Sequence, residues 1–130
     1  MSRPAAPKAN TAARRAEVAQ LTGLAYPYDG PAELAAAVDH ALRRVADPEV
    51  AMNIVDLGLV YGVALHGREL HVQVTMTSAA CPVADTIVGD IEHELDQAVP
   101  ADLVIRVQLV WEPPWSPERL SESARRFMGW

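Results

Sequence analysis

The residue best suited to reactive chemistry in this sequence is its single cysteine, Cys81. It precedes Pro82 and lies between a predicted strand and a predicted helix, so we expect Cys81 to cap the helix and Pro82 to be its first residue. The free N–H groups and positive dipole of a helix start favour a thiolate, and cysteines there commonly have a lowered pKa. This position indicates a nucleophile, a persulfide carrier or a metal ligand, whereas the residues alone also fit a packed, inert thiol.

One thiol restricts the kinds of site that the chain can build. A zinc finger or a complete cluster site needs about four ligands, so a second copy or an outside thiol would have to complete a site at Cys81. Such a site would be labile, which suits transfer better than storage. A papain-like enzyme would pair Cys81 with a histidine, but no spacing singles out one of His40, His66, His71 and His93. We therefore predict that the chain is not an enzyme.

Acids and hydroxyls accompany the cysteine at two places in the sequence. Asp47, Glu49 and Asp56 gather around the predicted end of the first helix, where ordinary turn chemistry also explains them. Thr77 and Ser78 come shortly before Cys81 and could donate hydroxyl hydrogen bonds to a thiolate. Their value for function depends on Cys81.

The elements that position these residues follow from periodicity and from helix-start and turn signals. The sequence predicts an α+β fold with the order α-β-β-α-β-α, in which helices cover one face of a three-stranded sheet. The first two strands should form an antiparallel hairpin. The expected elements are a helix from Pro31 to about Val45, strands at 59–66 and 70–77, a helix from Pro82 to before Pro100, a strand at 103–111 and a last helix from Pro117 to about Met128.

Composition and charge further restrict the domain organisation and the functions that the chain can have. At 130 residues the chain is expected to form one domain, at residues 29–130, after a flexible extension at residues 1–28. Four bases and one acid make that extension +3, which leaves −9 for the rest of a chain with net charge −6. An acidic domain without a basic stripe is unsuited to nucleic acid, and no apolar run is long enough to span a bilayer. We expect a cytoplasmic protein.

Four segments together resemble one protein family. They appear in the family's order and spacing: Asp47-Pro48-Glu49, the run from Asn53 to Tyr61, Thr75-Met76-Thr77-Ser78 leading to Cys81-Pro82, and the run from Val110 to Pro117. This pattern is similar to the PaaD-like, MIP18-like family of metal-sulfur cluster assembly proteins, which includes SufT. Ser78 stands where threonine is common in that family.

The resemblance implies a role in the maturation of iron-sulfur proteins, alongside the assembly machinery and apo-protein clients. It implies an adaptor, or a transient carrier of iron or of an iron-sulfur cluster, acting through Cys81 as the metal contact. Because each chain has one cysteine, a homodimer is one way to supply a second thiol. It also implies a shared cleft formed by Cys81, Asp47, Glu49, Asp56, Thr77 and Ser78. The alternative is a metal-free protein-protein interaction module in which Cys81 is merely packed.

Overall fold

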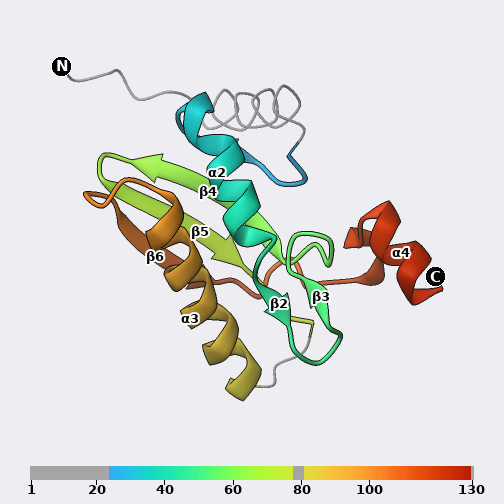
Figure 1. Cartoon of the computed structure of the whole chain (residues 1–130). Helices are drawn as coiled ribbons and strands as arrows, with labels where there is room; N and C mark the ends of the chain where they lie inside the picture. The colour runs from blue at the N-terminus through green and yellow to red at the C-terminus, as the bar shows by residue number, and fades with distance from the viewer. Residues whose placement is uncertain (1–23, 78–80, 130) are drawn as a thin grey trace.

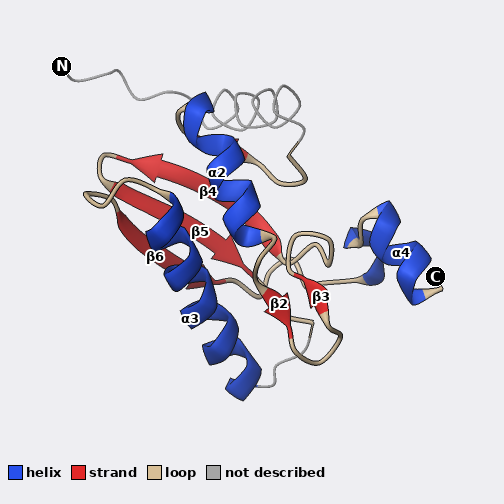
Figure 2. Ribbon diagram, viewed as in Figure 1, coloured by secondary structure: helices blue, strands red, loops and turns tan. Residues whose placement is uncertain are grey.

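The computed structural model describes residues 24–77 and 81–129, and it shows two helices packed on one face of a mixed sheet (Figures 1 and 2). The predicted α+β class is confirmed. Within the described residues, the strands of the sheet lie in the order β1 (Tyr28–Asp29), β4 (Val60–His66), β5 (Glu69–Val74) and β6 (Val104–Leu109). No helix in this part of the chain is long and apolar enough to cross a membrane.

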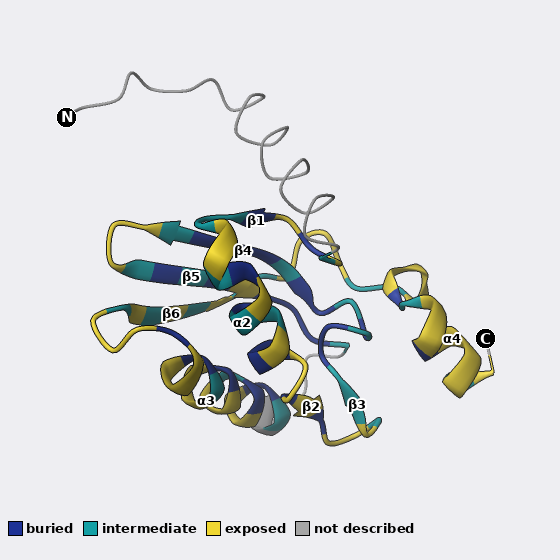
Figure 3. Cartoon of the chain, turned by 45° about the horizontal axis from the view of Figure 1, so that its top comes forward, coloured by how far each residue is buried: buried dark blue, intermediate teal, exposed yellow. Residues whose placement is uncertain are grey.

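The centre of the sheet is a hairpin of β4 (Val60–His66) and β5 (Glu69–Val74). The two strands pair antiparallel, with Val63 opposite Val72. Both of these valines are buried in the core, and Figure 3 shows buried stretches along both strands. The alternation of apolar and polar residues in the sequence therefore predicts this hairpin and the buried face of β5 correctly. In β4 an irregularity between Val60 and Gly62 sets Val60, which was expected on the outer face, opposite the buried Val74.

Helix α3 (Cys81–Ala98) connects β5 to β6 (Val104–Leu109), and β6 runs parallel to β5. Ile87, Ile91 and Leu95 recur at helical spacing on α3 and are fully buried. Helix α2 (Ala32–Leu42) packs beside α3 on the same face of the sheet. The core lies between these helices and the sheet.

The expected three-stranded sheet has a fourth strand, and a separate two-stranded sheet of β2 (Ala46–Asp47) and β3 (Met52–Asn53) was also not predicted. Strand β1 (Tyr28–Asp29) pairs in parallel with β4 at the edge opposite β6. Two residues are too few to show an alternation in sequence. Because Tyr26 and Tyr28 are buried in the core, the packed part of the chain includes the last residues of the predicted extension.

The start of the last helix also differs from the prediction. Pro117–Arg119 form a single 3₁₀ turn, and α4 (Glu122–Met128) begins only after a break. Leu120 between them is buried and extended, and the N–H of Ser121 donates to the carbonyl of Asp56 at 2.8 Å. Burial of Leu120 thus overrides the helix-start signal at Pro117, and Ser121 caps α4 instead by accepting from the Ala124 N–H at 3.0 Å.

Candidate functional site

A small two-stranded hairpin borders the start of α3. Its strands are β2 (Ala46–Asp47) and β3 (Met52–Asn53), which pair antiparallel. β2 contacts α3, and Figures 1 and 3 both place this hairpin beside the first turns of that helix. The segment that carries Asp47 and Glu49 is therefore next to the helix that begins at Cys81.

Asp47 shapes the turn of this hairpin. Its side chain is buried, and Oδ1 accepts from the backbone N–H of Glu49 at 2.9 Å. Its carbonyl accepts from the N–H of Ala51 at 2.8 Å, and Ala51 takes a left-handed conformation with φ of 54°. The structure thus brings Asp47 and Glu49 together, and the turn chemistry expected of an Asp-Pro sequence explains part of the arrangement.

Asp56 belongs to a different network. Its carboxylate accepts from Asn53 Nδ2 at 2.7 Å and from Arg43 Nη1 at 3.4 Å. Partial burial raises the pKa of Asp56, but hydrogen bonds from Asn53 and Ser121 and the charge of Arg43 outweigh burial and hold it below its ordinary value. Among the described residues, Asp56 thus links the end of α2 and the start of α4 to β3, and its hydrogen bonds do not involve the turn that contains Asp47.

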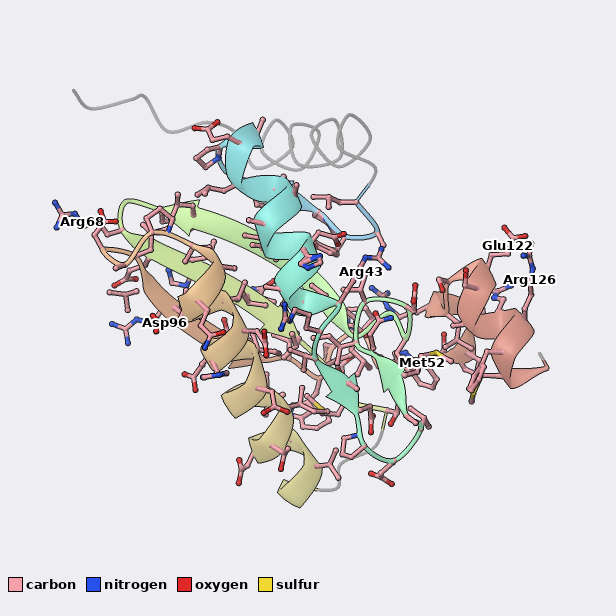
Figure 4. All side chains as sticks on the ribbon, in the orientation of Figure 1. Arg43, Met52, Arg68, Asp96, Glu122 and Arg126 are labelled. Carbon is pink, nitrogen blue, oxygen red and sulfur yellow. The ribbon has the colours of Figure 1, made fainter. Side chains whose placement is uncertain are left out.

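Arg43, Asn53 and Ser121 were missed by the sequence reasoning. Arg43 also donates through Nε to Asp39 at 2.9 Å, which fixes its guanidinium at the end of α2. Figure 4 shows Arg43 at this end of α2 and Met52 directed toward α4. No local pattern marks Arg43 or Ser121, because each reaches Asp56 from a distant part of the chain.

The segment between β5 and α3 holds the remaining predicted residues. Thr77 is half-buried in a bend after β5, and Ser78 lies outside the described residues. Helix α3 begins at Cys81 itself, one residue earlier than expected, so Cys81 is the first residue of the helix rather than its cap. The side chain of Cys81 is not described, so the full shared cleft stays a prediction.

The described part of the chain does not form a metal site of its own from protein side chains. Within it, no three side chains of His, Cys, Asp or Glu are grouped closely enough to hold a metal ion. The thiol of Cys81 lies outside the described side chains, and its predicted metal contact stays a prediction.

Two of the family-like segments meet in space. Trp115 donates its indole Nε1–H to the carbonyl of Leu57 at 2.6 Å, and the hydroxyl of Tyr61 donates to the carbonyl of Pro113 at 2.6 Å. The guanidinium of Arg119 stacks on the ring of Tyr61 at 4.0 Å. The C-terminal segment is thereby held against the loop that precedes β4.

Comparison with known proteins identifies the class. The chain belongs to the family of iron-sulfur cluster assembly proteins, whose model matches residues 35–109. It is 39% identical over 90 residues to the Fe-S protein maturation auxiliary factor YitW of Bacillus subtilis, covering 68% of this chain and 87% of that protein. It is 35% identical to the auxiliary factor SufT of Staphylococcus aureus, covering 65% of this chain and 97% of that protein. The predicted family is confirmed.

Other matches agree with this family. An iron-sulfur cluster carrier protein of Synechocystis is 32% identical over 60% of this chain, but the match spans 22% of the carrier. The crystal structure of a domain of unknown function from Bacillus anthracis superposes with a TM-score of 0.68 at 38% identity, covering 75% of this chain and 92% of that one. A conserved hypothetical protein of Thermotoga maritima gives a TM-score of 0.62 at 35% identity, covering 74% and 94%.

Proposed function

We propose that this chain is an auxiliary factor in the maturation of iron-sulfur proteins, and that it acts through Cys81 as an adaptor or a transient carrier of iron or a cluster. The observation that carries the proposal is family membership together with relatives that are named as maturation factors. The geometry supports it, because the acidic β2–β3 hairpin borders the helix that begins at Cys81.

The proposed chemistry depends on one labile bond, between the thiolate of Cys81 and iron. A thiolate at Cys81 is a ligand for iron, and a helix start favours the thiolate form. The acidic side chains of Asp47 and Glu49 favour a cation nearby. Since the chain has no second cysteine, the remaining ligands come from the donor, from the client or from a second copy. A cargo held so incompletely is readily passed on.

The proposed partners are the iron-sulfur assembly machinery and apo-protein clients, and the proposed compartment is the cytoplasm. The chain's part in this process is binding and positioning, with no catalysed reaction of its own. Affinity capture from cell extract tests the partners directly. Wild-type chain should retain assembly proteins or clients, and the Cys81→Ser variant should retain fewer of them.

The function is tested in cells that lack this chain. We expect reduced activity of iron-sulfur enzymes, restored by the wild-type chain and not by Cys81→Ser. Gly89→Ala is the matched control, since it changes an exposed position of the same helix where an added Cβ meets nothing within 4 Å. Full restoration by Cys81→Ser at equal protein level would refute the thiol-centred mechanism.

The alternative function is a metal-free interaction module. Large apolar side chains exposed at Trp111 and Phe127 are the observation that favours a partner-binding surface independent of the thiol. Alkylation at neutral pH separates the two proposals. Fast reaction of Cys81 supports the thiol-centred one, whereas slow reaction, with partner capture unchanged in Cys81→Ser, supports the interaction module.

A further inference from the structure

Strand β6 presents an unpaired edge in the described part of the chain. It lies at the outer side of the sheet in Figures 1 and 3 and pairs there with β5. The N–H groups of Val104 and Val110 donate to β5-side carbonyls, those of Arg68 and Val74, at 2.7 and 2.8 Å. Backbone groups alternate in direction along a strand, so those of residues 105, 107 and 109 point away from β5.

This edge also carries exposed apolar surface. Val104, the first residue of β6, is 46% exposed, and Trp111, two residues after its end, is 48% exposed. They are two of the three large apolar residues that are exposed in the described ranges. Between Leu103 and Trp111, the one charged residue is Arg106. A six-residue edge of this kind lacks the prolines, bulges and repeated charges that usually prevent strands from pairing.

We propose that a second copy of this chain pairs with β6 in the antiparallel direction, about a two-fold axis through Val107. This inference goes beyond the proposed function and does not depend on it. The axis places Val107 opposite Val107 of the other copy and sets the outward backbone groups of the two strands against each other.

The sequence of β6 is self-complementary in this register. On the face toward the helices, Ile105 lies opposite Leu109, and Leu103 lies opposite the exposed Trp111. On the other face, Val104 lies opposite Val110 and Arg106 lies opposite Gln108. In every pair within the stretch, at least one of the two facing residues is uncharged, so no two like charges face each other there.

Neighbouring registers are less favourable. A shift by two residues in one direction sets Arg106 against Arg106 of the other copy, and like charges directly opposite destabilise a pair. The shift in the other direction sets Val104 against Glu112. The like-charge pair therefore disfavours the register through Arg106, and the axis through Val107 keeps the apolar pair of Val104 and Val110, which the other shift replaces with Val104 and Glu112.

Acidic residues oppose the association in a testable way. Asp102 and Glu112 lie just outside the paired stretch and approach each other across the two-fold axis, and each copy has a net charge of −6. Salt screens such repulsion between exposed charges. The dimer should therefore tighten as sodium chloride is raised.

Sedimentation equilibrium of the full chain, over a wide range of concentration and with reductant to exclude a Cys81 disulfide, tests the proposal. We expect a monomer-dimer equilibrium. Val107→Pro removes an N–H that points away from β5, so the dissociation constant should rise by about tenfold or more while circular dichroism is unchanged.

Gln108 gives variants that keep the test valid if the proline variant does not fold, because its side chain is exposed. Gln108→Glu sets a negative charge opposite Arg106 twice per dimer and should lower the dissociation constant about threefold or more. Gln108→Arg should raise it by a similar factor. A wild-type chain that stays monomeric at every concentration would overturn the proposal. So would a dimer whose dissociation constant is the same in the wild type and in both Gln108 variants.

Discussion

Trp115 donates its indole N–H to the carbonyl of Leu57 at 2.6 Å, across 58 residues of sequence. Leu57 is buried and precedes Gly58, in the loop between β3 and β4, while Trp115 follows the bend at Glu112 and Pro113. This bond fixes the C-terminal segment on the loop that leads into the sheet. Two segments that the sequence singles out separately are therefore one structural unit.

Replacing Trp115 by phenylalanine should destabilise the fold. The change keeps an aromatic ring but leaves the buried carbonyl of Leu57 without its donor, which costs about 1 to 3 kcal/mol. The free energy of unfolding in urea measures the loss. Trp111→Phe is the matched control at a half-exposed position, and we expect it to change stability by about 0.5 kcal/mol or less at low protein concentration. Equal losses in the two variants would contradict the role assigned to Trp115.

Gly58→Ala should be more damaging still. Gly58 has φ of 75°, and an added Cβ would lie 2.2 Å from the carbonyl oxygen of Arg119, which belongs to the backbone. Strain and overpacking together should cost about 2 to 4 kcal/mol. Gly89→Ala, in α3, is the control, and it should raise stability by about 0.5 to 1 kcal/mol because alanine favours helix. Chemical denaturation compares the two, and an unchanged stability in Gly58→Ala would contradict the close approach.

Asp47 allows structure and charge to be tested separately. Asp47→Ala removes the acceptor for the Glu49 N–H and should lower stability by about 1 to 2 kcal/mol, measured by denaturation. Asp47→Asn retains an oxygen acceptor but removes the acid. If the acid assists iron or cluster cargo, Asp47→Asn should stay folded and deliver less cluster to a client. Full delivery by a folded Asp47→Asn would limit Asp47 to a structural role.

Asp56 should make stability depend on pH in the acid range. Because its pKa is lowered in the folded state, its carboxylate stabilises the fold above the ordinary pKa, and this contribution is lost as pH falls below about 4 through the lowered value. Asp56→Asn should therefore be less stable than wild type at neutral pH, and the difference should shrink at low pH. Thermal unfolding at several pH values measures this, with Asp85→Asn, on an exposed part of α3, as control. A difference that does not change with pH would contradict the network.

The main elements of the fold could be predicted because their patterns are local. The alternation that ends in Val72 and Val74 and the helical stripe that includes Ile91 each identify one element without reference to any other. Strands β1, β2 and β3 could not be predicted, because each has two residues and two residues carry no period. The start of α4 was mispredicted because the burial of Leu120 and the bond from Ser121 to Asp56 depend on tertiary packing.

The candidate site was predictable only in part, because some of its hydrogen bonds are local in sequence and others depend on tertiary packing. The turn that joins Asp47 to Glu49 spans three residues and follows from an Asp-Pro sequence. The partners of Asp56 come from α2 and from the cap of α4, and no spacing in the sequence links Arg43 to Ser121. The resemblance implies that Asp56 shares a cleft with Asp47, and this cleft stays a prediction, whereas the described hydrogen bonds of Asp56 join the end of α2, β3 and the cap of α4.

The central claim is that Cys81 takes part in delivering iron or a cluster to a client. The most direct measurement is the anaerobic transfer of a cluster from a loaded scaffold protein to an apo-protein client, followed by recovery of the client's activity. We predict that the wild-type chain accelerates transfer and that Cys81→Ser does not, while Gly89→Ala behaves as wild type. Equal acceleration by Cys81→Ser would contradict the account.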